Sequence, residues 1–241
     1  MKKILISSLL TLGALLTLNA QETVSYVPEP EPQQVELNYP SFRIAAQAGM
    51  GFRFGKIDSS LSSEERQHVK GLMNGFSFGL DATYFLNPGW GFGVKFNNFH
   101  AGDQKENATF ELDGHQMVGL MADQIDIWYL GPMFAARGFN KSMTLSYYVA
   151  FGLGYLGYNQ EMTRVGVGKL TGGTLGRQLE AGIDFYVSDH LSIGATANIL
   201  TGALSRIKFS SGSESKTVDL DKDSRENLSH ANVQIGLRYT F

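Results

Sequence analysis

The feature that most constrains the fold of this chain is an alternation of apolar and polar residues, which recurs eight times between residues 42 and 241. In the first segment, apolar side chains occupy every second position from Phe42 to Phe54. A period of two predicts a β-strand with one apolar and one polar face. The eight expected strands span residues 42–54, 76–86, 90–96, 125–134, 145–155, 179–187, 191–199 and 231–241.

The connections between these strands alternate in length. Turn-forming residues at 87–89, 140–142 and 188–190 predict tight turns. Between them lie long polar links, at roughly 55–72, 100–123, 159–174 and 203–228. This sorting is typical of barrels in outer membranes, and a soluble sandwich has no reason for it. We therefore expect an all-β fold, an eight-stranded antiparallel up-and-down transmembrane β-barrel.

The tight turns also predict the register of three hairpins, in which the apolar faces stay aligned as a half-buried sheet requires. The predicted pairs are Leu86–Trp90 and Asp81–Lys95 in the first hairpin, Phe139–Met143 and Ile127–Tyr155 in the second, and Val187–Leu191 and Ile183–Ala195 in the third.

The fourth strand is the least regular of the eight. Gly131-Pro132 lies inside it, and because proline cannot donate to a ladder we expect a bulge there. Its expected lipid-facing residues are Ile125, Ile127, Tyr129 and Met133.

The polar faces of the strands carry as many positive as negative charges. In a barrel with its apolar face towards lipid, these side chains fill a lumen that eight strands make just wide enough for packing. A balanced set predicts a packed polar core, because a charged pore would show a ring of one sign. Arg137 and Arg177 interrupt the apolar face, near strand ends where a long side chain can reach water. The predicted lumen network is Arg43, Arg53, Asp81, Lys95, Asp126, Glu180, Asp184 and Arg238.

The first 41 residues differ in character from the rest. Residues 1–20 combine a basic start, an apolar run and a final alanine, which predicts a cleaved signal peptide. Residues 21–41 hold four of the six prolines and predict an extended periplasmic tether, followed by the barrel at 42–241. Without residues 1–20 the chain has 18 basic and 23 acidic residues, a net charge of −5, which argues against a nucleic-acid partner. The absence of cysteine excludes disulfides and thiolate metal sites.

The strand pattern and the last strand together resemble the small eight-stranded outer-membrane barrels of the OmpA-barrel and OmpX-like kind. In that family the barrel-assembly machinery reads a final strand with a polar residue, a glycine two positions on and a terminal aromatic. Gln234, Gly236, Tyr239 and Phe241 match this pattern. The resemblance implies a location in the cell outer membrane, with membrane lipid and the assembly machinery as partners. The family's peptidoglycan-binding domain has no counterpart in this chain.

Three functions remain open from the sequence. The leading hypothesis is a non-enzymatic role in envelope integrity and in surface interaction, with a possible extracellular ligand bound by the loops. The second is a small porin-like channel for ions or apolar solutes. The third is a lipid A-modifying enzyme, for which a histidine beside a serine would be needed.

Few residues suggest chemistry. His190 with Ser192, and His230 with Ser229, are the candidate pairs for an activated serine, but turn and rim positions explain these histidines without catalysis. The acidic stretch 219–227 offers alternating carboxylates, yet it departs from the calcium-loop pattern at two positions. We therefore expect no catalytic residue, metal or cofactor.

Overall fold

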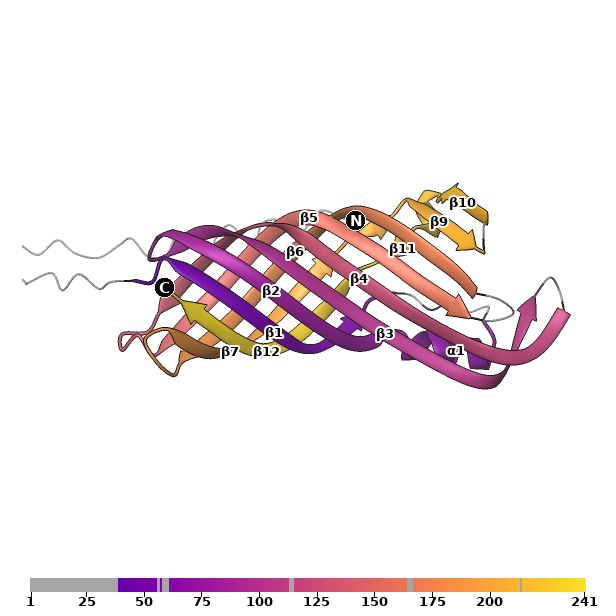
Figure 1. The fold of residues 1–241 in the computed structure, drawn as a ribbon, viewed down its shortest axis with the longest axis horizontal. Helices are drawn as coiled ribbons and strands as arrows, with labels where there is room; N and C mark the ends of the chain where they lie inside the picture. The colour runs from indigo at the N-terminus through magenta and orange to yellow at the C-terminus, as the bar shows by residue number, and fades with distance from the viewer. Residues whose placement is uncertain (1–38, 56, 58–60, 113–114, 164–166, 213) are drawn as a thin grey trace, which may run out of the picture. The chain divides into compact units, whose positions relative to one another are not determined.

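Eight long strands close into a ring in the computed structural model, and each strand is antiparallel to both of its neighbours (Figure 1). Closure follows from the pairing of β12 with both β1 and β7. This confirms the expected eight-stranded barrel. The ring strands are β1 (Phe42–Arg53), β2 (Asn74–Asn87), β3 (Trp90–Leu112), β4 (His115–Phe139), β5 (Leu145–Thr163), β6 (Val167–Tyr186), β7 (Leu191–Thr201) and β12 (His230–Thr240).

The structure describes residues 39–55, 57, 61–112, 115–163, 167–212 and 214–241. The predicted signal peptide and residues 21–38 of the predicted tether lie outside this range. Residues 39–241 form one compact unit. The last tether residues pack against it, because Tyr39 contacts the Phe139 ring and Arg137 donates a hydrogen bond to the Pro40 carbonyl.

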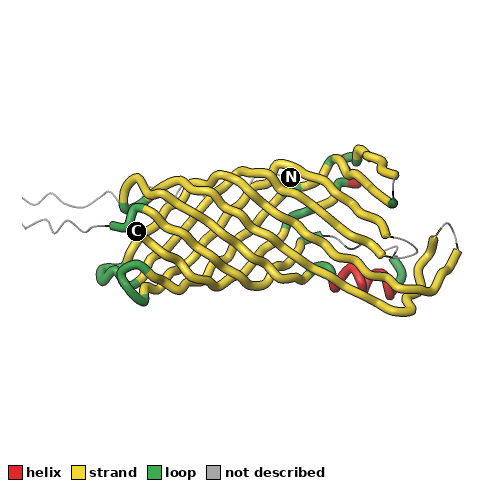
Figure 2. The backbone as a smooth tube through the Cα atoms, viewed as in Figure 1, coloured by secondary structure: helices red, strands yellow, loops and turns green. Residues whose placement is uncertain are grey.

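The two ends of the barrel differ. At one end, called here the turn end, short turns join β2 to β3, β4 to β5 and β6 to β7 (Figure 2). The opposite end, the loop end, carries the long connections. Two of these, expected as polar links at 100–123 and 159–174, are largely continuations of the β3–β4 and β5–β6 hairpins. Backbone pairing does not depend on an apolar face, so the loss of alternation marks the edge of the lipid-facing belt and not the end of the strand.

The other two long connections fold into small elements. The first contains α1 (Ser63–Gly71), and the second contains β8 (Ala203–Leu204), β9 (Arg206–Ser211), β10 (Glu214–Asp219), η1 (Lys222–Ser224) and β11 (Glu226–Asn227). β9 pairs with the outer part of β6, so the barrel wall continues past its rim as a sheet. Within the described ranges, no helix is long and apolar enough to cross a membrane.

Two of the three predicted registers are confirmed. Asp81 lies opposite Lys95 in the first hairpin, and Ile183 lies opposite Ala195 in the third. A bulge between Phe85 and Asn87 shifts only the end of the first hairpin, where Trp90 pairs with Asn87 instead of Leu86.

The predicted second register is wrong. Phe139 pairs with Ser146 instead of Met143, and Ile127 pairs with Tyr158 instead of Tyr155. The turn is longer than expected because the Asn140 side chain organises it, accepting a hydrogen bond from the Leu145 amide. A shift of three residues is odd, so it moves the side chains of one strand to the other face.

The fourth strand is therefore inverted relative to the prediction. Ile125, Ile127, Tyr129 and Met133 are buried inside the barrel, while Trp128 and Leu130 face outward. Asp126 also faces outward, where it pairs with His100 on β3.

Two further expectations for this strand are also wrong. Arg137 turns inward, over the ring of buried Phe85. No bulge forms at Pro132, because the register with β5 is the same at Leu130 and at Met133. The ladder is only interrupted between them.

Candidate functional site

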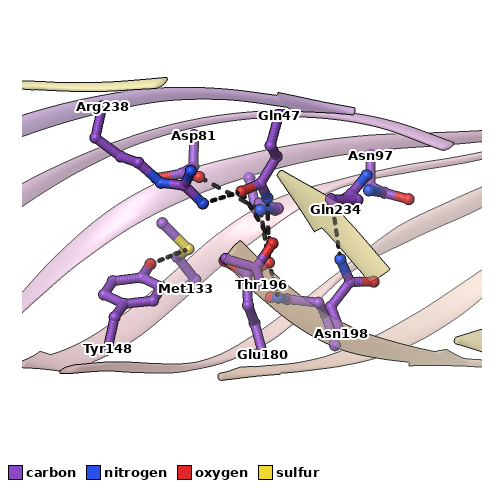
Figure 3. A network of polar contacts seen from close by, with 12 residues as sticks. Gln47, Asp81, Asn97, Met133, Tyr148, Glu180, Thr196, Asn198, Gln234 and Arg238 are labelled. Carbon is purple, nitrogen blue, oxygen red and sulfur yellow. Dashed lines mark hydrogen bonds and ion pairs between the residues drawn. The ribbon is translucent and has the colours of Figure 1, made fainter. Parts of the chain in front are cut away.

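Six of the predicted lumen residues meet in one buried group, called here the charged network. Figure 3 labels three of them, Asp81, Glu180 and Arg238. The six residues come from five strands, and the regular alternation of each strand brings its side chain inward. The group holds three positive and three negative side chains, all buried. The ion pairs are Arg43–Asp81 at 2.6 Å, Arg43–Asp184 at 3.2 Å, Arg238–Asp184 at 3.0 Å, Lys95–Glu180 at 2.6 Å and Lys95–Asp81 at 3.3 Å.

The other two predicted lumen residues lie elsewhere. Asp126 is on the outer face, as described above. Arg53 lies at the loop end, where it forms a 2.8 Å ion pair with Glu226 and donates a hydrogen bond to the Asn227 carbonyl. Arg53 thereby ties β1 to β11 in the last long connection.

Neutral polar side chains complete the interior between the charges, and the sequence analysis did not single most of them out. Gln47 accepts hydrogen bonds from Thr196 and from Arg238, and Asn232 donates to Asn198. The sequence could have identified these residues, because they occupy the inward positions of strands whose orientation was predicted correctly. Figure 3 shows Gln47, Thr196 and Asn198 converging from two strands, β1 and β7, and Asn198 donates a hydrogen bond to Gln234.

The predicted assembly-signal residues have individual structural roles. The Gln234 amide donates a 2.8 Å hydrogen bond to Ser77 in the lumen. Gly236 lies so close to the Ala46 carbonyl that a Cβ would overlap it. Tyr239 and Phe241 are exposed on the outer face with ring centroids 4.7 Å apart. Recognition of this strand by the assembly machinery stays a prediction.

A buried apolar cluster lies in the loop-end half of the interior, and the sequence analysis did not anticipate it. Eight wall residues gather there, and three leucines from the long connections, Leu72, Leu204 and Leu228, join them. We call this cluster the apolar plug. Its wall residues are Phe99, Ala101, Ile125, Ile127, Tyr129, Leu156, Tyr158 and Leu200.

Besides the apolar plug, the His68 side chain also joins α1 to the barrel at the loop end. The Nδ1 atom of His68 lies 2.6 Å from Asp103, and its Nε2 atom lies 3.1 Å from Asp123. Hydrogen bonds to Asp123 and Asp103 raise the pKa of His68 above its ordinary value, although burial acts in the opposite direction.

The candidate catalytic histidines lie apart from each other and make structural contacts. His190 lies at the turn end, bonds to the Thr240 carbonyl and stacks on Tyr239. His230 is buried at the loop end, bonds to the Leu228 carbonyl and packs on the Phe99 ring. Both rings are therefore held by backbone carbonyls.

The carboxylates of the acidic stretch 219–227 also have separate partners. Asp219 ends β10 and pairs with Arg206 at 2.6 Å, whereas Glu226 pairs with Arg53. These two carboxylates are each held by an arginine, on different elements.

Comparison with known proteins agrees with this geometry. A family model described as "Outer membrane protein beta-barrel domain" matches residues 32–241. No curated protein sequence matches the chain. Similar solved structures include a major outer membrane protein from Thermus thermophilus, with a TM-score of 0.55, 14% identity and coverage of 83% of this chain and 100% of that one. Another is OprG from Pseudomonas aeruginosa, with a TM-score of 0.52, 13% identity and coverage of 84% and 97%.

Neisserial surface protein A is also similar, with a TM-score of 0.50, 15% identity and coverage of 83% of this chain and 97% of that one. At these identities the similarity concerns the fold alone.

Proposed function

Because the chain belongs to the outer membrane protein β-barrel family and lies in the cell outer membrane, we propose that it is a non-enzymatic barrel that binds an extracellular partner through its loop end. The long connections of such barrels face the cell exterior. The apolar outer face contacts membrane lipid, and the loop end presents a sheet formed by β10, β9 and the outer part of β6.

One observation carries this proposal, the open edge of that sheet. In the described residues, β10 pairs with β9 and with no other strand, and all six of its residues are exposed. An unpaired edge presents backbone N–H and C=O groups to which an extended segment can add as a further strand. The sheet therefore favours an extended polypeptide as the partner.

The filled interior supports a binding role over a channel. A conducting path would have to cross both the apolar plug and the charged network, whose side chains are buried. No residue contact described above favours the enzyme hypothesis. In the described residues the Ser192 hydroxyl has no hydrogen-bond partner, and the Ser229 hydroxyl accepts from the Gly202 amide, so neither serine is bonded to its candidate histidine.

The test uses the barrel in liposomes and a synthetic peptide with the sequence of β9, Arg206–Ser211, which already pairs with β10 on one side. Hydrogen exchange of the β10 amides should slow when the peptide binds. A variant with residues 207–218 replaced by a short Gly-Ser link is the control and should not bind the peptide. Equal exchange with and without peptide would exclude edge pairing.

A further inference from the structure

A single imidazole bridges two carboxylates at the loop end. His68 on α1 is 1% exposed, with one ring nitrogen against Asp103 and the other against Asp123. Asp103 on β3 and Asp123 on β4 lie directly opposite each other in the ladder. Like charges at such positions repel, so the imidazole occupies the place where a positive charge is most needed.

The Nδ1 contact with Asp103 is a hydrogen bond, and the 3.1 Å contact of Nε2 with Asp123 is an ion pair by distance, so a charged ring with a proton on each nitrogen suits both. An ionised carboxylate only accepts hydrogen bonds, and a neutral imidazole has one donor and one acceptor nitrogen. A neutral His68 would therefore direct a lone pair at one of the two aspartates. Only the imidazolium form donates to both.

This contact positions the element that closes the apolar plug. α1 begins with a capping box between Ser62 and Glu65 and ends next to Leu72, which is buried in the plug. Gly71 allows the close approach, because a Cβ at this position would overlap the Asp103 carboxylate. The His68 contact and the insertion of Leu72 are only one helical turn apart.

We propose that His68 is a pH-dependent clasp, whose protonated ring fastens α1 to the β3–β4 hairpin and whose deprotonation releases α1 and Leu72 from the apolar plug. The pKa of His68 is raised in the folded protein, so the stabilisation is complete below the ordinary histidine pKa of about 6.5 and is lost as pH rises through the higher folded value. The clasp is closed in mild acid and opens as pH rises past the raised pKa of His68.

Several charged groups surround the clasp. Histidine alone has an ordinary pKa between about 5 and 8, and no other histidine lies among them. These groups are Asp103 and Lys105 on β3, Asp123 on β4, Tyr158 on β5, Arg53 on β1, Glu226 on β11, and Glu64, Glu65, Arg66 and Lys70 on α1.

The experiment follows the mobility of α1 as pH changes. The chain has no cysteine, so Lys70→Cys gives a unique, exposed site for a nitroxide label on α1. In liposomes, the electron paramagnetic resonance spectrum should show an immobilised label at about pH 5 and a mobile label at about pH 9. The transition between them should follow a one-proton titration with a midpoint above about pH 6.5. A label at Ser215→Cys on β10 is the matched control and should show no such transition.

Two variants distinguish the clasp from other causes. Asp103→Asn should stay immobilised throughout, because an amide can donate to the unprotonated ring nitrogen and the repulsion with Asp123 is removed. His68→Gln should be mobile throughout, because glutamine carries no positive charge to offset the repulsion between Asp103 and Asp123. A transition-free spectrum in the parent chain, or the parent's transition in either variant, would overturn the proposal.

Discussion

The two halves of the barrel interior are enclosed by the same eight strands but differ in their main contents. Ion pairs dominate the turn-end half, and apolar side chains dominate the loop-end half. The turn-end half also holds a smaller apolar cluster of Phe85, Met133, Ala135, Tyr148 and Ala150. The turn-end half holds the charged network, whose six members all come from ring strands. The loop-end half holds the apolar plug, which recruits Leu72, Leu204 and Leu228 from the connections. The first half is complete once the barrel has closed, whereas the second also depends on how the loops fold.

This difference implies that the turn-end half is rigid and that the loop-end half can change conformation. Buried charges are tolerated only when each has its partner, so the charged network couples β1, β2, β3, β6 and β12 into one unit. The apolar contacts of Leu72, Leu204 and Leu228 are non-directional. These side chains can therefore move out of the plug while the eight strands stay paired. A conformational change at the loop end is therefore compatible with a rigid turn end.

The largest effect is expected from removing one negative charge, which leaves three positive and two negative side chains buried in the network. Glu180→Gln removes the 2.6 Å partner of Lys95 and should lower the free energy of unfolding by about 3–5 kcal/mol. Urea unfolding in lipid vesicles measures this value. Adding Lys95→Met should restore most of the loss, since Asp81 keeps Arg43. A double variant as unstable as the single one would show that the ion pairs are not the coupling element.

A smaller effect is expected in the apolar plug. Leu204→Ala deletes a fully buried side chain, but the connection around it can relax, so the expected loss is about 2 kcal/mol, near the lower limit for such substitutions. The same unfolding measurement compares the two halves. Leu175→Ala, on the exposed outer face of β6, is the matched control. It should lower the free energy of unfolding by less than Leu204→Ala does.

The contrast between the two halves of the interior also depends on the orientation of β4, which places Ile127 and Tyr129 in the apolar plug. Trp128 then faces lipid, and Trp90→Phe leaves it as the only tryptophan of the chain. Brominated lipids should quench its fluorescence strongly. If brominated lipids leave the fluorescence unchanged, Trp128 points into the barrel, as the sequence predicted.

The smallest effect is expected for leakage. Liposomes holding the protein should retain ions and small solutes as well as empty liposomes, because the two halves close the lumen in series. Combining Leu72→Ala with Leu204→Ala should leave them tight, since the charged network remains. Steady leakage through the unmodified protein would favour the channel hypothesis, with Asp81, Lys95, Glu180 and Arg238 as candidate pore residues.

Much of this molecule could be predicted from local pattern. Strands with one clearly apolar face, such as 76–86 and 90–96, have the orientation that alternation predicts, and the polar faces of these two strands identified Asp81 and Lys95 as partners. The His68 contact could not be found this way. Its three residues are far apart in sequence, and no pattern links a histidine in a loop helix to aspartates 35 positions or more away.

The sequence by itself determined the number of strands, their antiparallel order and the register of two hairpins, because an alternating strand has only one orientation that buries its apolar face in lipid. The tertiary structure alone decided the orientation of β4. Its segment IDIWYL carries apolar side chains on both faces, so periodicity contains no preference. The choice depends on the apolar plug, in which Ile127 and Tyr129 meet side chains from strands and loops that come together only when the barrel closes.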